Sequence, residues 1–158
     1  MAYRKRSFTE KLADDKDLPK VERLSGSMLR RWGAGTMVLA SAGEIDRLMR
    51  KVRRGRVTTV NQIRSVLAEW HGTTTACPIV TGIHAWVAAC AAGEQEAEGR
   101  TRVTPYWRTL KEGGELNPKY PGGVARQRRR LQAEGHTIVS RGKRQFVADH
   151  ERRLARLR

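Results

Sequence analysis

Cys77 and Cys90 are the residues of this chain best suited to nucleophilic chemistry. Cys77 directly precedes Pro78, and proline in the first turn predicts that Cys77 stands at the start of a helix. The positive end of a helix dipole lowers the pKa of a nearby thiol and makes it more reactive. Burial is nevertheless the commoner fate of a free cysteine, and Cys90 falls on an apolar stripe. The sequence therefore favours a structural role for both, with an enzyme using Cys77 as the distant alternative.

Metal and cofactor chemistry has little support in the sequence. The four histidines (His71, His84, His136 and His150) are scattered, and together with the two cysteines they form no metal-ligand spacing. No phosphate-loop pattern is present, and the glycine pairs are typical of turns. We expect no metal, no cofactor and no small-molecule substrate.

Arginines gather ahead of a second predicted helix. Arg53, Arg54 and Arg56 precede Thr58 and Thr59, either of which can cap that helix. Threonine hydroxyls and free backbone N–H groups at a helix start bind phosphate oxygens. This spacing predicts contacts to a phosphate backbone.

The charge balance of the whole chain agrees with a polyanionic partner. Lysine and arginine total 32 against 16 acidic residues, which leaves a formal charge of +16. Neutralising phosphates releases counterions, so such an excess is typical of nucleic-acid-binding proteins. A membrane surface ranks lower because no run approaches about 18 apolar residues and no basic amphipathic helix carries large aromatic residues. The N-terminus lacks an apolar signal core, so we expect a cytoplasmic, nucleoid-associated protein.

The length of 158 residues and the 39% apolar content allow one domain with tails. Ser41 and Glu44 predict a capping box that opens a helix, and further helices follow at about 60–70 and from Pro78 to Gly93. In the third helix, the apolar stripe is predicted to comprise Ile79, Ile83, Trp86, Val87 and Cys90. Residues 36–39 are expected either to form one strand or to lead the chain into the domain.

Hairpins are predicted after the helices. Residues 104–116 are expected to form a hairpin that turns at Gly113 and Gly114, followed by a basic helix over 123–133. A second basic hairpin spans about 137–148, and a short helix follows it. The fold class is thus mainly α with small β hairpins, in the order of a winged-helix DNA-binding domain. We expect a basic, partly extended arm (1–40), that domain (41–136) and a basic C-terminal hairpin with a short helix (137–158).

Three stretches resemble the C-terminal domain of the alkylguanine-DNA alkyltransferases. They are GRVTTVNQIR at 55–64, TPYWRTLKEGGEL at 104–116, and YPGGV at 120–124 leading to LQAEGH at 131–136. The resemblance covers about 44–136 and implies a winged-helix fold of the alkyltransferase type that docks its third helix in the minor groove of duplex DNA.

The resemblance fails at the chemical centre of that family. Where the family has proline, cysteine, histidine and arginine, this chain has Pro105, Tyr106, Trp107 and Arg108. Alkyl transfer needs a thiolate, and a phenol with a pKa near 10 is a poor substitute. Alkyltransferase-like proteins also lack the cysteine yet bind alkylated guanine, and this chain is similar to them. We therefore expect no enzymatic activity.

Two further departures concern base flipping. Val60 stands where the family has a tyrosine, and the segment 77–80 stands where it has an intercalating arginine. Flipping a base costs a few kcal/mol and normally needs such a group. We therefore expect the protein to bind a DNA groove. The two departures argue against recognition of a lesion by base flipping.

The resemblance and the charge together define three sets of site residues. The expected DNA contacts are Arg53, Arg54, Arg56, Thr58, Thr59, Asn61, Gln62, Pro78, Thr81, Gly82, His84 and Ala85. The remnant active-site pocket comprises Pro105, Tyr106, Trp107, Arg108, Tyr120, Gly122, Gly123 and Glu134. Additional polyanion contacts are expected from Arg126, Arg128, Arg129, Arg130, Arg141, Lys143 and Arg144.

These sets predict a non-catalytic protein that binds duplex DNA, with a role in DNA repair or damage sensing and a repair protein as a further partner. The alternative is a protein that binds structured RNA or ribosomes with the same basic scaffold, because the resemblance leaves the basic C-terminal third unexplained.

Overall fold

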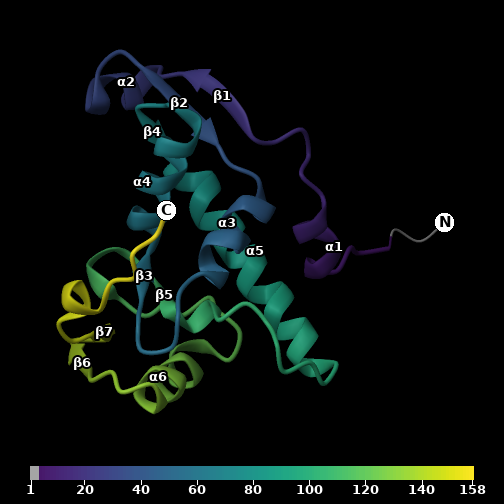
Figure 1. The fold of residues 1–158 in the computed structure, drawn as a ribbon, viewed down its shortest axis with the longest axis vertical. Helices are drawn as coiled ribbons and strands as arrows, with labels where there is room; N and C mark the ends of the chain where they lie inside the picture. Colours follow the sequence, from purple (N-terminus) through teal and green to yellow (C-terminus); the bar gives the residue numbers. More distant parts are fainter. Residues whose placement is uncertain (1–3) are drawn as a thin grey trace.

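The computed structural model describes residues 4–158 and is mainly helical (Figure 1). The helices are α1 (Phe8–Ala13), α2 (Gly26–Trp32), α3 (Ala42–Arg50), α4 (Val60–His71), α5 (Pro78–Ala97) and α6 (Gly123–Ala133). The strands are β1 (Lys20–Arg23), β2 (Thr36–Leu39), β3 (Thr58–Thr59), β4 (Thr75–Ala76), β5 (Thr109–Leu110), β6 (Ile138–Arg141) and β7 (Arg144–Val147). Short 3-10 turns are η1 (Tyr106–Arg108), η2 (Glu112–Gly114) and η3 (His150–Arg153). The predicted class, mainly α with small β elements, is confirmed.

Local capping signals set where the central helices begin. Ser41 and Glu44 form the predicted capping box at the start of α3. Thr59 caps α4 by accepting a hydrogen bond from the Gln62 backbone N–H at 3.1 Å. Pro78 occupies the first turn of α5, as predicted. The residues that form these caps are neighbours along the chain, so the sequence alone predicts them well.

The sequence predicts that the third helix ends at Gly93. In the structure, α5 continues to Ala97. A Cβ at Gly93 would lie 2.8 Å from Cγ of Pro121, so the glycine allows the chain around Pro121 to approach the helix closely. Gly93 is therefore a packing residue rather than a helix stop.

The main core lies where α3, α4 and α5 meet. Ile45, Leu48, Met49, Ile63 and Leu67 are wholly buried there. A second, smaller apolar cluster lies between β5, α6 and β7 and includes Leu110, Leu116 and Leu131. Because α4 and α5 both contribute residues to the first cluster, core packing fixes how these two helices lie against each other.

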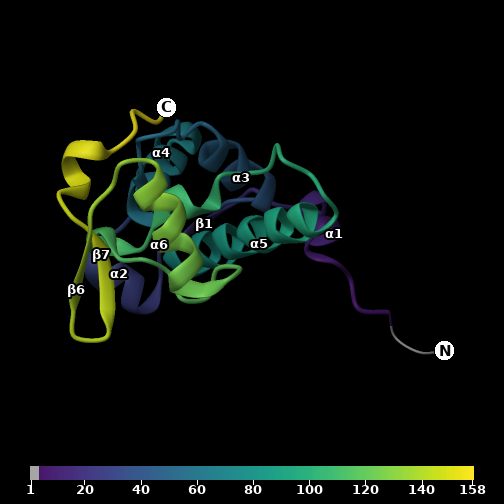
Figure 2. The same ribbon diagram turned by 90° about the horizontal axis from the view of Figure 1, so that it is seen from below.

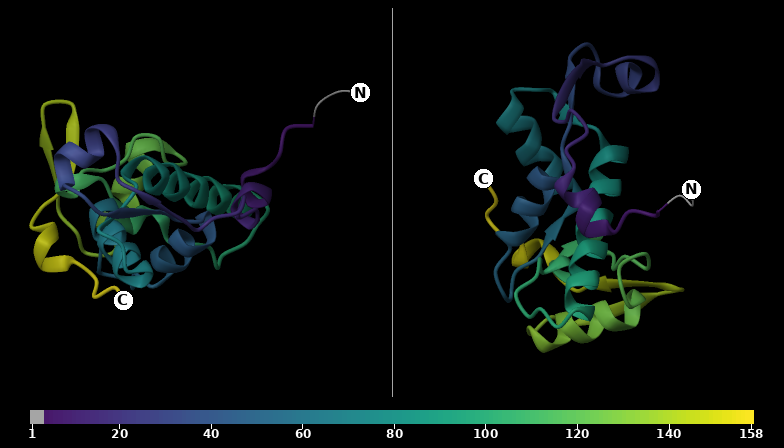
Figure 3. Two further views of the ribbon diagram at one scale, coloured as in Figure 1. Left: turned by 90° about the horizontal axis from the view of Figure 1, so that it is seen from above. Right: turned by 90° about the vertical axis from the view of Figure 1, so that its right-hand side faces the viewer.

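Residues 4–40 of the predicted arm, which is expected to be partly extended, carry regular structure, and α1 and β2 within them pack on this core. Residues 1–3 of that prediction lie outside the described residues. Helix α1 lies against α5 (Figure 3). Phe8 meets Trp86 there edge to face, with 5.0 Å between ring centroids. Strand β1 pairs antiparallel with β2, which pairs in parallel with β4. The predicted strand at 36–39 is confirmed, and Val38 within it is wholly buried.

The hairpin predicted over 104–116 is wrong. Gly113 and Gly114 do have positive φ angles of 76° and 85°, but they belong to the turn η2. Lys111 donates its backbone N–H to Glu115 O at 2.8 Å across the turn, but no described strand after the turn pairs with β5. Instead, Glu115 bridges Phe146 of β7, and Leu116 donates its backbone N–H to Gln145 O at 2.9 Å. Strand β5 instead pairs in parallel with β3. The second predicted hairpin is confirmed as β6–β7.

The C-terminal segment is fixed to the body of the fold by backbone hydrogen bonds. Val57 donates to Arg153 O at 2.9 Å, and Ala155 donates to Val57 O at 2.8 Å. Gln62 Nε2 also donates to Ala155 O at 2.6 Å. In Figure 1 the segment consequently runs beside β3, close to the loop 51–57. Within the described residues, no helix is long and apolar enough to cross a membrane.

Candidate nucleic-acid interface

A cleft of about 550 Å³ opens between the first turn of α4, the first half of α5 and the loop 111–120. Its floor includes Pro78, Ile79 and Ile83 of α5. Ile79 and Ile83 are 64% and 51% exposed, which is unusual for such large apolar side chains. Between them, apart from the chain neighbours of Gly82 and the backbone of α5 itself, no described atom lies within 4 Å of the position that a Cβ on Gly82 would occupy. The backbone of α5 is therefore accessible at Gly82.

The exposed face of α5 carries isoleucines that the sequence pattern places in the core. Ile79 and Ile83 had been assigned to the core stripe of α5, and that assignment is wrong. The buried face of the helix instead carries small residues, among them Ala85, Ala88, Ala89 and Ala92. Small residues let α5 pack closely on α3 and α4, so the larger isoleucines are left on the outside.

Cations surround the apolar part of the cleft. Arg64, Lys111 and Lys119 line it together with a single carboxylate, Glu112. Arg64 is held in place because Nε donates to Ala76 O at 2.9 Å and Nη2 donates to Thr75 Oγ1 at 3.0 Å. Burial lowers the pKa of Arg64 from its usual value, and Arg31 lowers it further, but an arginine remains charged. The cleft thus offers a fixed positive charge beside an apolar floor.

The structure brings only some of the expected contacts to this cleft. Asn61, Pro78 and Gly82 line it. Thr81 and Ala85 lie in the core, so contact by these two is excluded in this structure. His84 is half-buried, and its Nδ1 lies 2.9 Å from Ala40 O, so it faces the protein interior.

The helix-start phosphate site predicted at Thr58 and Thr59 is also closed. Both threonines are buried, and Thr59 Oγ1 already accepts from the Gln62 backbone. Thr58 Oγ1 lies 2.6 Å from Gln62 Oε1, while the Gln62 amide holds the C-terminal segment. Thr58, Thr59 and Gln62 therefore act as structural residues, which corrects their assignment as contacts.

The remnant pocket is filled by its own side chains. Tyr106 is wholly buried, and its hydroxyl donates to Pro121 O at 3.4 Å. Its ring lies edge to face with Trp107 at 5.4 Å and with Tyr120 at 5.8 Å. Burial raises the pKa of both phenols, so neither offers a phenolate nucleophile.

Beneath this pocket lies an ion pair. Arg108 Nε donates to Glu134 Oε1 at 2.7 Å, and Trp107 Nε1 donates to Glu134 Oε2 at 3.1 Å. Arg108 Nη1 also donates to Val52 O at 2.7 Å. Burial disfavours the charged form of Glu134, but the hydrogen bonds from Arg108 and Trp107 outweigh it, so its pKa lies below its usual value. Glu134 is a structural anchor here.

The glycine turn of the remnant pocket leads into α6. Gly122 and Gly123 have φ angles of 78° and 68°, which a side chain would disfavour. Pro105 immediately precedes the turn η1 that carries Tyr106. Of the predicted pocket residues, Tyr120 lines the cleft at the start of α5, while Tyr106 and Trp107 do not.

Most basic residues predicted as additional contacts are already engaged. Arg126 and Arg130 approach Glu96 at 3.8 and 2.5 Å, and Arg144 pairs with Glu115 at 2.8 Å. Arg128 donates to Gln145 Oε1 at 3.0 Å. These arginines hold α6 and the β6–β7 hairpin in place. Only Arg129, Arg141 and Lys143 of that set are exposed without an ion pair among residues 4–158.

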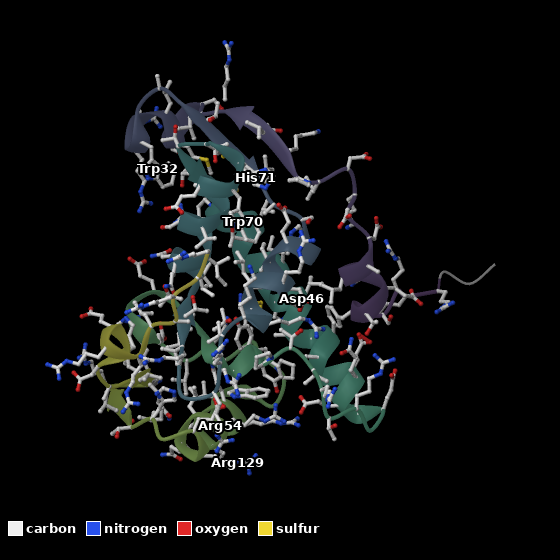
Figure 4. All side chains as sticks on the ribbon, viewed as in Figure 1. Trp32, Asp46, Arg54, Trp70, His71 and Arg129 are labelled. Carbon is white, nitrogen blue, oxygen red and sulfur yellow. The ribbon has the colours of Figure 1, made fainter. Side chains whose placement is uncertain are left out.

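A second concavity, of about 780 Å³, contains two of the predicted arginines. Arg53 and Arg56 line it with residues of α3 and of the C-terminal segment. Arg54 lies apart, where Nη2 donates to Ala133 O at 2.9 Å at the end of α6. Figure 4 shows Arg54 and Arg129 toward the end of the molecule formed by α6, and Trp32 toward the opposite end.

The two cysteines are structural. Cys77 is buried at the N-cap of α5, and burial raises the pKa of Cys90 to about 11. The described part of the chain holds no group of three or more His, Cys, Asp or Glu residues that could bind a metal ion.

No family model and no curated protein matches this chain. Among solved structures, one match is the crystal structure of S. pombe Atl1 in complex with damaged DNA containing O6-carboxymethylguanine. It is 16% identical, covers 73% of this chain and 94% of that chain, and has a TM-score of 0.48.

Proposed function

We propose that this protein binds nucleic acid without catalysing a reaction, and that its physiological ligand is duplex DNA. The observation that carries the proposal is the cleft at the start of α5, where exposed isoleucines and an open glycine lie beside two lysines and the hydrogen-bonded Arg64. Phosphate contacts supply affinity, while the apolar floor suits sugar and base edges.

We infer further that α5 docks in the minor groove at Gly82. The groove is about 6 Å wide, so a helix can approach it closely only where its side chains are small. Gly82 offers such a point between the exposed side chains of Ile79 and Ile83, which would meet sugar and base edges. Arg64 and Lys119, which line the same cleft, would contact the flanking phosphates. This arrangement supports backbone-dominated binding with little sequence preference.

The absence of catalysis is proposed from the state of Tyr106. Its ring is buried, and its hydroxyl is hydrogen-bonded to Pro121 O. A substrate alkyl group has no path to that oxygen in this packing, and the raised pKa keeps the phenol protonated.

A role in damage recognition is the finer form of the proposal. A cleft of about 550 Å³ falls within the usual size of small-molecule sites, so an unstacked base fits against Ile79 and Ile83. Lesions that weaken pairing lower the cost of unstacking. Recruitment of a repair protein would then follow binding.

The test is fluorescence anisotropy with matched short duplexes, one of them carrying an alkylated guanine, and with a structured RNA hairpin. In the Gly82→Glu variant, negative charge and bulk face the cleft. Since glutamate is the better helix former and space is open there, the variant is expected to fold. We expect duplex affinity to fall about tenfold or more at about 50 mM salt.

The matched control is Gln132→Glu, which changes the charge equally on an exposed position of α6. We expect it to lower affinity by less than about threefold. Equal losses in both variants would refute the cleft as the interface, and tighter binding of the hairpin than of either duplex would assign the protein to RNA. Tighter binding to the alkylated duplex would support damage sensing.

A further inference from the structure

The concavity opposite the cleft is lined by six cationic side chains and no carboxylate. They are Arg50, Lys51, Arg53, Arg56, Arg152 and Arg156, which we term the basic basin. Two separate parts of the chain meet here: the end of α3 with the loop 51–57 that follows it, and the C-terminal segment. Like charges that gather in a concavity raise the local potential and attract anions.

The basin is built into the fold rather than formed by loose surface side chains. The hydrogen bonds of Val57 to Arg153 and Ala155 fix the C-terminal segment next to the loop. Arg56 Nη1 further donates to Arg152 O at 3.3 Å. Arg152 and Arg156 are thereby held across from Arg53 and Arg56 by backbone geometry.

The charges of the basin are largely uncompensated. Arg50 is paired with Asp46 at 2.8 Å. Arg53, Arg56, Arg152 and Arg156 make no ion pair with any described residue, in contrast to Arg108, Arg130 and Arg144 elsewhere in the molecule. The protein thus places carboxylates beside its structural arginines and leaves these four available.

The basin and the cleft share no lining residue. Figure 2 shows α3, α4 and the C-terminal segment on one side of the molecule and α5 on the other. A straight duplex docked against α5 is therefore expected to leave the basin uncovered.

From this geometry we propose that the basic basin is a phosphate-binding site that takes the backbone of a second DNA segment, so that one protein molecule bridges two segments. This inference rests on the proposed function for the first segment, while the phosphate site itself stands on the basin alone. Arginine suits the role because its planar fork binds phosphate oxygens in pairs.

The experiment uses the full chain and three proteins. The basin variant is Arg53→Gln/Arg152→Gln/Arg156→Gln, whose exposed side chains make no hydrogen bond within residues 4–158, so that the fold is retained. The matched control removes three positive charges elsewhere, as Arg129→Gln/Arg141→Gln/Lys143→Gln. Circular dichroism melts confirm that both variants fold.

Two readouts separate the phosphate site from bridging. Calorimetry with tripolyphosphate measures the basin alone, and capture of a labelled duplex on an immobilised duplex measures bridging. We expect the basin variant to lose about tenfold or more in tripolyphosphate affinity and to lose capture, while it keeps binding to a single short duplex within about threefold. The control variant is expected to retain both readouts within about threefold.

The remaining outcomes would each refute one part of the proposal: the phosphate site, the bridging or the proposed function. Equal losses in the control would show a general charge effect and refute the basin. Wild-type protein that binds single duplexes but neither tripolyphosphate nor a second duplex would also refute it. Wild-type protein that binds tripolyphosphate through the basin but no duplex would refute the proposed function and bridging while leaving the phosphate site. Binding of tripolyphosphate without capture would refute bridging and assign the basin to free polyphosphates.

Discussion

The arginines around α6 and those of the basic basin have opposite environments within one chain. Around α6, Arg108 and Arg130 are held by Glu134 and Glu96. In the basin, Arg53 and Arg156 have no carboxylate partner among the described residues. Both regions look alike in the sequence as runs of positive charge. The structure distinguishes arginines that hold the fold together from arginines that are free to bind a ligand.

The difference has a physical origin in burial. The side chains of Arg108 and Glu134 are 14% and 4% exposed, so an unpaired charge there would be costly. The basin is open to water, which solvates its guanidinium groups and tolerates their proximity at ordinary ionic strength. Stability is therefore expected to depend on the first set, and binding on the second.

The largest effect on stability is expected when the buried carboxylate of Glu134 is removed. Glu134→Ala leaves Arg108 buried without a carboxylate, and we expect the free energy of unfolding to fall by about 3–5 kcal/mol in urea titrations. As a control, Arg53→Ala should change it by no more than about 0.5 kcal/mol. Similar values for the two variants would contradict the distinction between the regions.

Acidification should destabilise the protein through His136, which lies at the end of α6 between the two regions. Its ring is buried, and no described group hydrogen-bonds either nitrogen. Burial lowers the pKa of His136 below its usual value of 6.5, and Arg153 lowers it further. The unfolded chain thus binds a proton more readily, so stability is fully present above about pH 6.5 and is lost as the pH falls toward the lower folded-state pKa.

Thermal melts between pH 8 and pH 5 check this expectation. The pKa of His84 is also lowered by burial, so it contributes in the same direction. His136→Leu should flatten the pH dependence in part and leave the remainder to His84. A variant with an unaltered pH profile would show that His136 is not the titrating group.

Conversion of paired arginines into free ones should have an effect of intermediate size. Glu96→Gln removes the partner of Arg126 and Arg130, and we expect a loss of about 1 kcal/mol in unfolding free energy because these pairs are partly exposed. Tripolyphosphate affinity should rise, since two arginines become available. If calorimetry finds an unchanged affinity for tripolyphosphate, then arginines without a carboxylate partner are not sufficient to form an anion-binding site.

The smallest expected effect concerns repulsion within the basin. Arg53→Gln/Arg156→Gln should leave stability unchanged or raise it by up to about 0.5 kcal/mol at low ionic strength. Added NaCl should shrink that difference because it screens exposed charges. Measurable destabilisation at every salt concentration would mean that these side chains serve the fold after all.

The sequence predicted the features that depend on near neighbours along the chain. Ser41, Thr59 and Pro78 mark helix starts through contacts within one turn. The β6–β7 hairpin follows from two short strands separated by a tight turn. It also predicted a positively charged chain, since composition alone sets the net charge.

Prediction failed where distant segments compete for the same partner. Gly113 and Gly114 have the backbone angles of a turn, yet the chain beyond them pairs beside β7 instead of β5. Periodicity assigned Ile79 and Ile83 to the core, because the large side chains gave the stronger apolar signal. In the structure, the alanine face of α5 is buried instead, since close packing against α3 and α4 favours small residues.

By itself, then, the sequence determined where α3, α4 and α5 begin and an excess of positive charge, because these depend on local interactions or on composition. Only the tertiary structure decided which arginines meet a carboxylate and which stay free. Arg108 and Glu134 are 26 residues apart, and Arg56 and Arg152 are 96 apart. Such distant pairs are brought together by packing of the whole chain, and no local pattern contains that information.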